Sequence, residues 1–265
     1  MINKQRAGDF GRPPSVYAAL MDEVISSTAN PTIKSFKRLH RARGRREAMA
    51  TLIEGPIVFR EALAAGADIR TVLIEKGDES ALALCAEYSC EFTMATAEVL
   101  ASAGDTVHPQ SPLAMISTPE PDRMHYRDTL VLRDISDPGN VGTMIRSAAA
   151  FGWDVCVTGS SAHPWNPKVV RSGAGAHFKV HLSFSDDPIA DAKELGLDVA
   201  ASVVSDGEMP KRGEHPIALL IGSEAHGLSS VDIESSDRAM TIPIADDSES
   251  LNAAVAASVL MYVLS

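Results

Sequence analysis

The chain has 265 residues, 45% of them hydrophobic and 22% charged, which is enough for one large or two modest buried cores. Its 35 acidic and 24 basic residues give a net charge of −11, and its longest apolar stretch is too short to cross a bilayer. Composition therefore excludes an integral membrane protein, and we expect a cytoplasmic protein that is not exported. The three cysteines, Cys85, Cys90 and Cys156, have no metal-ligand spacing and indicate reduced thiols, so no metal site is predicted.

A strongly basic arm follows an N-terminal extension, residues 1–30, to which we assign no function. The arm contains seven basic residues and no acid: Lys34, Lys37, Arg38, Arg41, Arg43, Arg45 and Arg46. The rest of the chain has 17 basic against 35 acidic residues. Because polyanion affinity comes from local Lys and Arg contacts, this segment suits phosphate binding. A solvated helix face or a partner-binding arm explains the pattern equally well.

Residues 31–118 are expected to form a small α/β domain. Strands are predicted over residues 48–53, 71–75 and 91–94, and helices over residues 57–65, 79–87 and 97–103. This alternation of short strands and helices is typical of a compact α/β unit. Prolines then interrupt the pattern, at Pro109, Pro112, Pro119 and Pro121. We therefore place a linker in residues 117–126, and the second domain, residues 125–265, begins at the end of this linker.

The second domain begins with a strand over residues 129–132, a Pro138-Gly139 turn and a helix over residues 141–151. Asn140 is expected to cap this helix, and Arg146 to lie near enough for both side chains to meet one substrate. The glycine spacing is G-x-x-G, the acidic residue of a dinucleotide fingerprint is absent, and no phosphate-binding lysine follows. A Rossmann-type oxidoreductase is therefore disfavoured.

The remaining strands of the second domain are short and apolar. They are predicted over residues 153–157, 180–182, 199–204, 217–221 and 240–244, with helices over residues 168–175, 188–195 and 251–264. Runs this apolar fit a parallel sheet covered on both faces. Ligands of such sheets bind outside the carboxyl ends of the strands, where Asn140, Glu224 and Ser250 are expected.

Three motifs stand in order along this domain. They are Asn140-Val141-Gly142-Thr143-Met144-Ile145-Arg146, Gly222-Ser223-Glu224-Ala225-His226-Gly227-Leu228, and Ile242-Pro243-Ile244 followed by Ser250-Leu251-Asn252-Ala253-Ala254-Val255-Ala256. Together they resemble the SpoU/TrmH family of RNA ribose 2′-O-methyltransferases in the SPOUT superfamily. The segment Asn166-Pro167-Lys168-Val169-Val170-Arg171 is also similar to that family. More loosely, the basic arm and Glu54-Gly55 resemble its N-terminal substrate-binding domain, an α/β module like a ribosomal protein.

The resemblance implies an α/β fold in which a parallel-sheet SPOUT domain ends in a C-terminal trefoil knot. It implies S-adenosyl-L-methionine as cofactor, held around Gly222, Ser223, Ile242, Ile244 and Leu251. The catalytic residues that it implies are Asn140, Arg146, Glu224, Ser250 and Asn252. The residues expected to bind RNA are Lys37, Arg38, Arg41, Arg43, Arg45 and Arg171. It also implies a homodimer packed through the knotted domain, with the last helix in the contact.

Methyl transfer requires that the methyl donor and the ribose 2′-hydroxyl be held in line. It also requires a group that assists the hydroxyl in losing its proton. Because a guanidinium stays protonated, Arg146 is given an electrostatic role rather than that of a base. The sequence departs from the family at Asp246 and Asp247, extra acids near the cofactor loop, and at Ala253-Ala254, where Val-Ser is usual. We expect neither departure to disable the site.

Several alternatives stay open. Asn140, Ser250 and Asn252 could serve only as helix caps, and Glu224 could be a solvated turn residue, as His226 is expected to be. Arg171 could equally pair with a surface acid. The expected substrate is ribosomal RNA, 23S above all. A transfer RNA substrate and a non-catalytic RNA-binding protein that keeps the fold are the alternatives.

Overall fold

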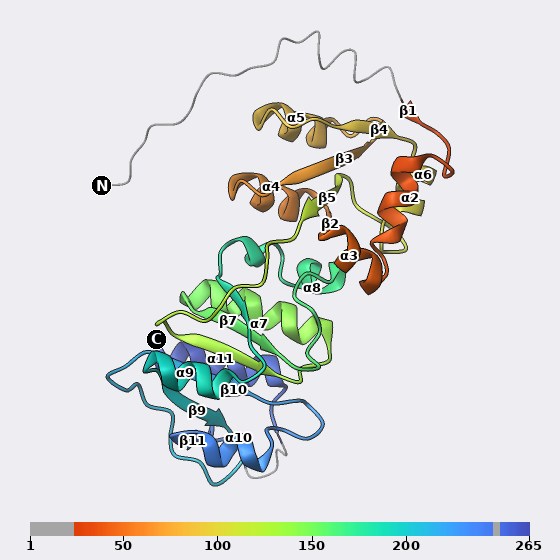
Figure 1. The fold of residues 1–265 in the computed structure, drawn as a ribbon. Helices are drawn as coiled ribbons and strands as arrows, with labels where there is room; N and C mark the ends of the chain where they lie inside the picture. The colour runs from red at the N-terminus through yellow and green to blue at the C-terminus, as the bar shows by residue number, and fades with distance from the viewer. Residues whose placement is uncertain (1–23, 246–249) are drawn as a thin grey trace, which may run out of the picture. The chain divides into compact units, whose positions relative to one another are not determined.

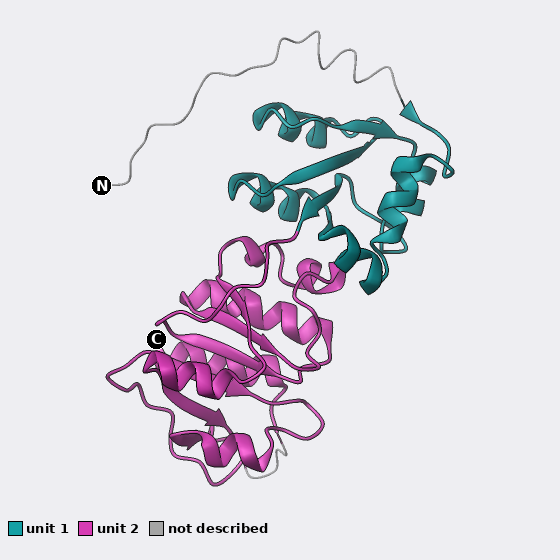
Figure 2. Ribbon diagram, in the orientation of Figure 1, with its two compact units in different colours: residues 1–117 teal, residues 118–265 magenta. Residues whose placement is uncertain are grey.

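A computed structural model describes residues 24–245 and 250–265, and the chain divides into two compact units at residue 117 (Figures 1 and 2). Each unit is built on its own β-sheet with its own buried apolar cluster. Of the helices in the described part of the chain, none combines the length and apolarity needed to cross a membrane.

The first unit contains a five-stranded sheet in the order β1-β4-β3-β5-β2. Its strands are β1 (Val24–Ile25), β2 (Ala50–Glu54), β3 (Ile69–Glu75), β4 (Thr93–Ala95) and β5 (Leu113–Ser117). β4 pairs in parallel with β1 and β3, whereas β5 is antiparallel to both β2 and β3. The predicted α/β character of this unit is therefore confirmed, with a mixed sheet.

Two strands of this sheet were missed by the sequence analysis. β1 lies in the segment expected to be an extension, and its two residues are too few to show a period. β5 lies among the prolines used to predict an interruption, between Pro112 and Pro119. The prolines flank the strand without entering it, so its five backbone N–H groups stay available for pairing. Leu113–Ser117 consequently occupies the interior of the sheet.

Five helices accompany this sheet: α2 (Pro31–Arg38), α3 (Ala42–Ala48), α4 (Pro56–Ala64), α5 (Glu79–Glu87) and α6 (Ala97–Ala103). The basic arm forms α2 and α3. Ile33 and Phe36 of α2 are fully buried in the core that includes Val99 and Leu100 of α6. One face of α2 is thereby fixed, and its basic residues are left on the other.

The second unit contains a six-stranded, wholly parallel sheet in the order β11-β9-β10-β6-β7-β8. Its strands are β6 (Thr129–Arg133), β7 (Asp154–Thr158), β8 (Leu182–Phe184), β9 (Asp198–Ser202), β10 (Ile217–Ile221) and β11 (Arg238–Met240). The predicted parallel sheet is confirmed. Because all strands run the same way, their carboxyl ends form a single edge.

Helices cover both faces of this sheet. They are α7 (Pro138–Phe151), α8 (Pro167–Ser172), α9 (Pro188–Leu195), α10 (Ser230–Ser235) and α11 (Ala253–Leu264), with a 3₁₀ turn, η1 (Ala176–Phe178). Leu130 and Leu132 of β6 are buried with residues of α7 and α11. Val131, which points the opposite way, is buried with Ile189 and Ala192 of α9. Burial on both faces explains why these strands are continuously apolar.

The boundaries of two elements correct the sequence analysis. α7 begins at Pro138, and its N-cap is Asp137, whose carboxylate accepts from the Asn140 N–H at 2.9 Å. The prediction that Asn140 caps the helix is therefore wrong, and its side chain is free for other partners. β11 ends at Met240, so the Ile242-Pro243-Ile244 segment lies beyond the strand. Pro243 lacks an N–H and cannot extend the ladder.

Candidate active site

Three of the predicted catalytic side chains form a hydrogen-bonded network. Asn140 Nδ2 donates to Glu224 Oε1 at 2.6 Å, and Asn252 Nδ2 donates to Asn140 Oδ1 at 3.1 Å. The three residues come from the first turn of α7, the loop after β10 and the N-cap of α11. Asn140 therefore joins two segments that lie 84 and 112 residues further along the chain.

The network fixes how the Asn140 amide is oriented. A carboxylate only accepts hydrogen bonds, so the NH₂ end of Asn140 must face Glu224. The carbonyl end then accepts from Asn252. Glu224 is thus more than a solvated turn residue, although its side chain is exposed.

Asn252 combines a capping role with a role in the network. Its Oδ1 accepts from the backbone N–H groups of Ala254 and Val255, which are otherwise unpaired at the start of α11. Its Nδ2 is the group that donates to Asn140. The two ends of one amide therefore tie the last helix to the first turn of α7. Ser250 has no hydrogen bond to any other described residue and is exposed.

A cavity of about 480 Å³ lies beside this network, at the carboxyl ends of β9, β10 and β11. All five residues predicted to hold the cofactor line it: Gly222, Ser223, Ile242, Ile244 and Leu251. Glu224, Ser250 and Asn252 line it as well. Apolar side chains and polar groups both line the cavity, and a concave site of this volume is typical of small-molecule binding. Asn140 is connected to this cavity through its hydrogen bonds to two of the lining residues.

The loop after β10 folds into a compact turn at one wall of the cavity. The Gly227 N–H donates to the Ser223 carbonyl at 2.8 Å, and the Ser223 hydroxyl accepts from the His226 N–H at 3.2 Å. Gly222 lies under this turn, where an added Cβ would stand 2.2 Å from the Gly227 carbonyl carbon. Only glycine therefore fits between the strand and the turn.

Residues that the sequence analysis left out also border this cavity. Val203 and Val204 follow β9, and His226 belongs to the turn after β10. The rule that ligands bind beyond the carboxyl ends of parallel strands would have included the two valines. Asp246 and Asp247, singled out as departures from the family pattern, lie outside the described residues.

Arg146 stands apart from the Asn140 network. Six residues along an α-helix correspond to about 1.7 turns, so its side chain leaves α7 about 120° around the axis from that of Asn140. The guanidinium is exposed and has no hydrogen bond or ion pair with a residue that the structure describes. Arg171 at the end of α8 is half-buried and likewise unpaired among the described residues.

Close contact between α7 and α8 sets the positions of these two arginines. An added Cβ at Gly142 would lie 2.5 Å from both Ser172 Cβ and the Val169 carbonyl oxygen. The glycine of the first motif therefore serves the packing of the two helices. Arg146 lies one turn beyond Gly142 on α7.

The histidine buried behind α8 is an unsuitable proton acceptor. Nε2 of His177 lies 2.9 Å from the Pro164 carbonyl oxygen, which can only accept, so Nε2 carries the hydrogen. Burial lowers the pKa of His177 to about 4, and the ring is neutral at physiological pH. Its side chain has almost no exposed surface, so it fixes the segment after α8 and does not exchange protons with a substrate.

In the first unit, four of the predicted RNA-binding residues surround a shallow hollow between α2 and α3. Its lining consists of Lys37, Arg38, Arg41, Arg43, Gly44 and Glu47. Glu47 accepts hydrogen bonds from both Arg38 and Arg43. Arg41 is exposed and Lys37 half-buried, and neither is paired with a described residue.

Arg45 differs from the other arginines of the arm. Its Nη1 donates to the Leu39 and His40 carbonyl oxygens at 2.9 and 3.0 Å. Burial lowers the pKa of this guanidinium below its usual value. Arg45 therefore closes the turn between α2 and α3, and its donors are directed inward.

Both units of this chain are similar to known protein domains. Residues 128–262, over half of the chain, match the model of the SpoU rRNA Methylase family. The chain belongs to this family. Residues 30–114 match the MRM3-like substrate binding domain, so both units have counterparts in known proteins.

Relatives of the family match along nearly the whole chain. The 23S rRNA (guanosine(2553)-2′-O)-methyltransferase RlmP of Bacillus subtilis is 31% identical, over 91% of this chain and 98% of its own. Among solved structures, the AdoMet-bound rRNA methyltransferase from Sinorhizobium meliloti shares the fold with a TM-score of 0.80, at 23% identity over 91% of this chain and 96% of its own.

The SpoU methyltransferase AviRb from Streptomyces viridochromogenes, in complex with the cofactor AdoMet, has a TM-score of 0.76 and 25% identity. It matches over 88% of this chain and 96% of its own. These likenesses confirm the predicted combination of a SPOUT-type domain with an N-terminal substrate-binding domain. The trefoil knot stays a prediction.

Proposed function

We propose that this protein transfers a methyl group from S-adenosylmethionine to a ribose 2′-hydroxyl of 23S ribosomal RNA. The network of Asn252, Asn140 and Glu224 beside the cavity carries the proposal, because it joins the three family motifs at one place. The catalytic domain in this proposal is residues 125–265, and residues 31–118 bind the RNA. The identity to RlmP and the match to a substrate binding domain support the ribosomal substrate.

The lining of the cavity fits S-adenosylmethionine. Its volume of about 480 Å³ is in the range of small-molecule sites, and Ile242, Ile244 and Leu251 offer apolar surface to a purine. The backbone N–H groups of Ile242 and Ile244 donate to no residue that the structure describes, so they are available to ring nitrogens. Glu224 also lines the cavity, and its carboxylate complements a cation.

When bound, S-adenosylmethionine supplies a methyl group on a positively charged sulfur. The protein must hold the ribose against it, and the Asn140 amide, fixed at both ends, is suited to orient the acceptor. Arg146 has five N–H donors and no lone pair, so it cannot take the proton. Its charge instead favours the ionised hydroxyl and neutralises an RNA phosphate.

The proposal is tested by incubating the purified protein with methyl-labelled S-adenosylmethionine and unmodified 23S rRNA or transfer RNA, followed by digestion to nucleosides. We expect a labelled 2′-O-methylnucleoside from the ribosomal substrate. Label on transfer RNA alone would reassign the substrate. RNA binding without any label, with cofactor binding demonstrated separately, would favour a non-catalytic RNA-binding protein.

The hollow between α2 and α3 leads to a prediction about RNA affinity. Replacing Lys37, Arg38 and Arg41 by alanine removes three cations from this surface. We expect RNA affinity to fall at least about tenfold, and the slope of log affinity against log salt to decrease by about two, because fewer counterions are released. Filter binding across a salt series measures both quantities.

Exposed basic residues elsewhere in the first unit give a matched control. Arg60 and Lys76 are exposed and unpaired among the described residues, and they lie outside the hollow. Their double alanine variant is expected to bind RNA like the wild type. An unchanged salt slope in the triple variant would show that the arm serves another partner.

The last helix supports a homodimer. α11 has no charged residue, and its inner side chains, among them Leu260 and Met261, are fully buried. On its outer side, Val255, Val259 and Tyr262 form a stripe at helical spacing and are 48%, 37% and 71% exposed. A helix that is apolar on every side requires a cover on its outer face, and a second copy of this chain supplies the same apolar stripe.

We expect Val255→Glu combined with Val259→Glu to convert the dimer to a monomer, because four carboxylates would be buried across the two-fold contact. Sedimentation velocity measures the change in mass. Val231→Glu on α10 is the control, since this valine is 68% exposed and lies on another helix. A wild type that sediments as a monomer would remove α11 from the interface.

A further inference from the structure

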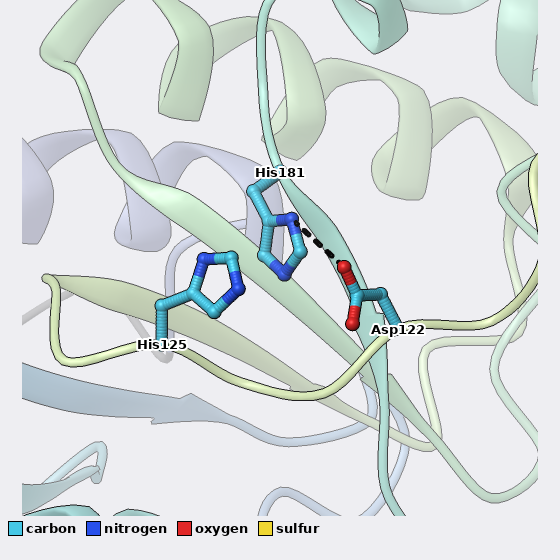
Figure 3. A group of neighbouring side chains, drawn as sticks. All are labelled: Asp122, His125 and His181. Carbon is cyan, nitrogen blue, oxygen red and sulfur yellow. Dashed lines mark ion pairs between the residues drawn. The ribbon is translucent and has the colours of Figure 1, made fainter.

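Two histidines and an aspartate outside the active site come together at the edge of the second sheet (Figure 3). Each of Asp122, His125 and His181 offers a ligand atom, and these atoms lie within 4.8 Å of one another. The first two residues precede β6, whereas His181 directly precedes β8. The cluster is therefore at the amino end of a strand, and the active-site cavity lies at the carboxyl ends.

The hydrogen bonds of His181 show which of its nitrogens carries a lone pair. Nε2 lies 2.8 Å from the Arg123 carbonyl oxygen, so in the neutral ring it is the protonated nitrogen. Nδ1 then presents a lone pair, and it lies 3.9 Å from Asp122 Oδ2. Between them there is room for a bridging group, which can be a proton on Nδ1, a water molecule or a metal ion.

The backbone of Arg123 fixes both of these groups. Its N–H donates to Asp122 Oδ1 at 2.8 Å, and its carbonyl accepts from His181. A histidine that ligates a metal typically donates its other N–H to a carbonyl in this way, and a ligating carboxylate is typically held by a hydrogen bond. The outer contacts of a metal site are therefore already present around Asp122 and His181.

His125 is placed to supply the third ligand. Its ring stacks on that of His181, with centroids 3.8 Å apart and planes at 17° (Figure 3). Nearly parallel rings cannot both direct in-plane lone pairs at one ion, so His125 must turn about its side-chain bonds. It is exposed, and its ring has no hydrogen bond to another residue in the described part of the chain, so this rotation is open to it.

We propose that Asp122, His125 and His181 bind a divalent transition-metal ion of the zinc class. Two imidazoles and a carboxylate suit zinc, with one coordination position left for water. The ion would link residues 122–125 to the edge strand β8, where the Phe184 N–H already donates to the Asp122 carbonyl at 3.1 Å. Its role is structural and independent of the proposed methyl transfer.

Calorimetric titration of the full-length, EDTA-treated protein with ZnCl₂ tests the site, together with the thermal midpoint with and without zinc. We expect one zinc ion per chain and a higher midpoint, reversed by EDTA. His125→Ala should reduce zinc affinity at least about tenfold and abolish the rise in midpoint, without disturbing the Arg123 contacts. His181→Ala should do the same.

Two control variants exclude other sources of zinc binding. His215→Ala removes an exposed histidine of the same unit, and Cys90→Ser removes the half-exposed thiol; both should bind zinc like the wild type. Equal zinc affinity in the wild type and His125→Ala would overturn the proposal. A wild type that binds no zinc would also overturn it, because a proton or a water molecule would then bridge Asp122 and His181.

Discussion

Arg146→Ala is expected to reduce methyl transfer at least about 100-fold while leaving the affinity for S-adenosylmethionine within about twofold of the wild type. The side chain is exposed on α7 and does not line the cavity beside Asn252. Its removal should therefore leave the cofactor site intact. On the proposed mechanism, the variant lacks the positive charge that favours ionisation of the 2′-hydroxyl, and single-turnover kinetics with saturating RNA measures that loss directly.

Two further variants distinguish the loss of the positive charge from a loss of folding stability. Arg146→Lys keeps the charge but not the planar fork, and it should retain part of the rate. Thr143→Ala changes an exposed neighbour on the same helix, whose hydroxyl donates to the Gly139 carbonyl and to no other residue that the structure describes, and it should be nearly silent. Because Arg146 is unpaired among the described residues, the thermal midpoint of Arg146→Ala should stay unchanged. Turnover like that of the wild type would remove Arg146 from the mechanism.

Local signals in the sequence were sufficient to predict many of the elements. The helices at Glu79–Glu87, Ala97–Ala103 and Pro188–Leu195 agree with their predicted bounds because Asp78, Thr96 and Asp187 cap them. Strand β5 was missed because Pro112 and Pro119 lie close to it, and a proline pattern does not distinguish a flanked strand from a loop. The position of β5 between β2 and β3 depends on long-range pairing, which no local signal encodes.

In the active site, too, the residue types could be predicted from the sequence, whereas the contacts between them could not. The rule for parallel sheets predicted Asn140 and Glu224 at one edge of the sheet, but their catalytic roles, and that of Asn252, were predicted only through the resemblance to a family. Taken alone, each was better explained as a cap or a turn residue, and Asn252 is indeed a cap. The hydrogen bonds between them depend on how β10 and α11 are placed beside α7, which is set by the packing of the whole sheet.

Gly222→Ala is expected to weaken S-adenosylmethionine binding at least about tenfold and to lower stability by about 1–3 kcal/mol. The new Cβ would lie 2.2 Å from the Gly227 carbonyl carbon and 2.3 Å from the Leu228 nitrogen. Both are backbone atoms, so the turn over residues 223–227 must move. This turn contributes Ser223 and Glu224 to the cavity wall, and the displacement would reach the Asn140 network. Calorimetric titration with the cofactor and thermal unfolding measure the two effects.

Gly227→Ala is the control that distinguishes the steric clash at Gly222 from the effect of placing a side chain at a positive φ angle in the same turn. Gly227 has a φ of +68°, but nothing lies within 4 Å of the position where its Cβ would be. Alanine there costs about 1–2 kcal/mol of conformational energy without displacing a neighbour. Its cofactor affinity should therefore fall less than that of Gly222→Ala. If Gly222→Ala bound the cofactor as tightly as the wild type, the turn would not be part of the binding wall, and the methyl donor would have to be held by the segments after β9 and β11 alone.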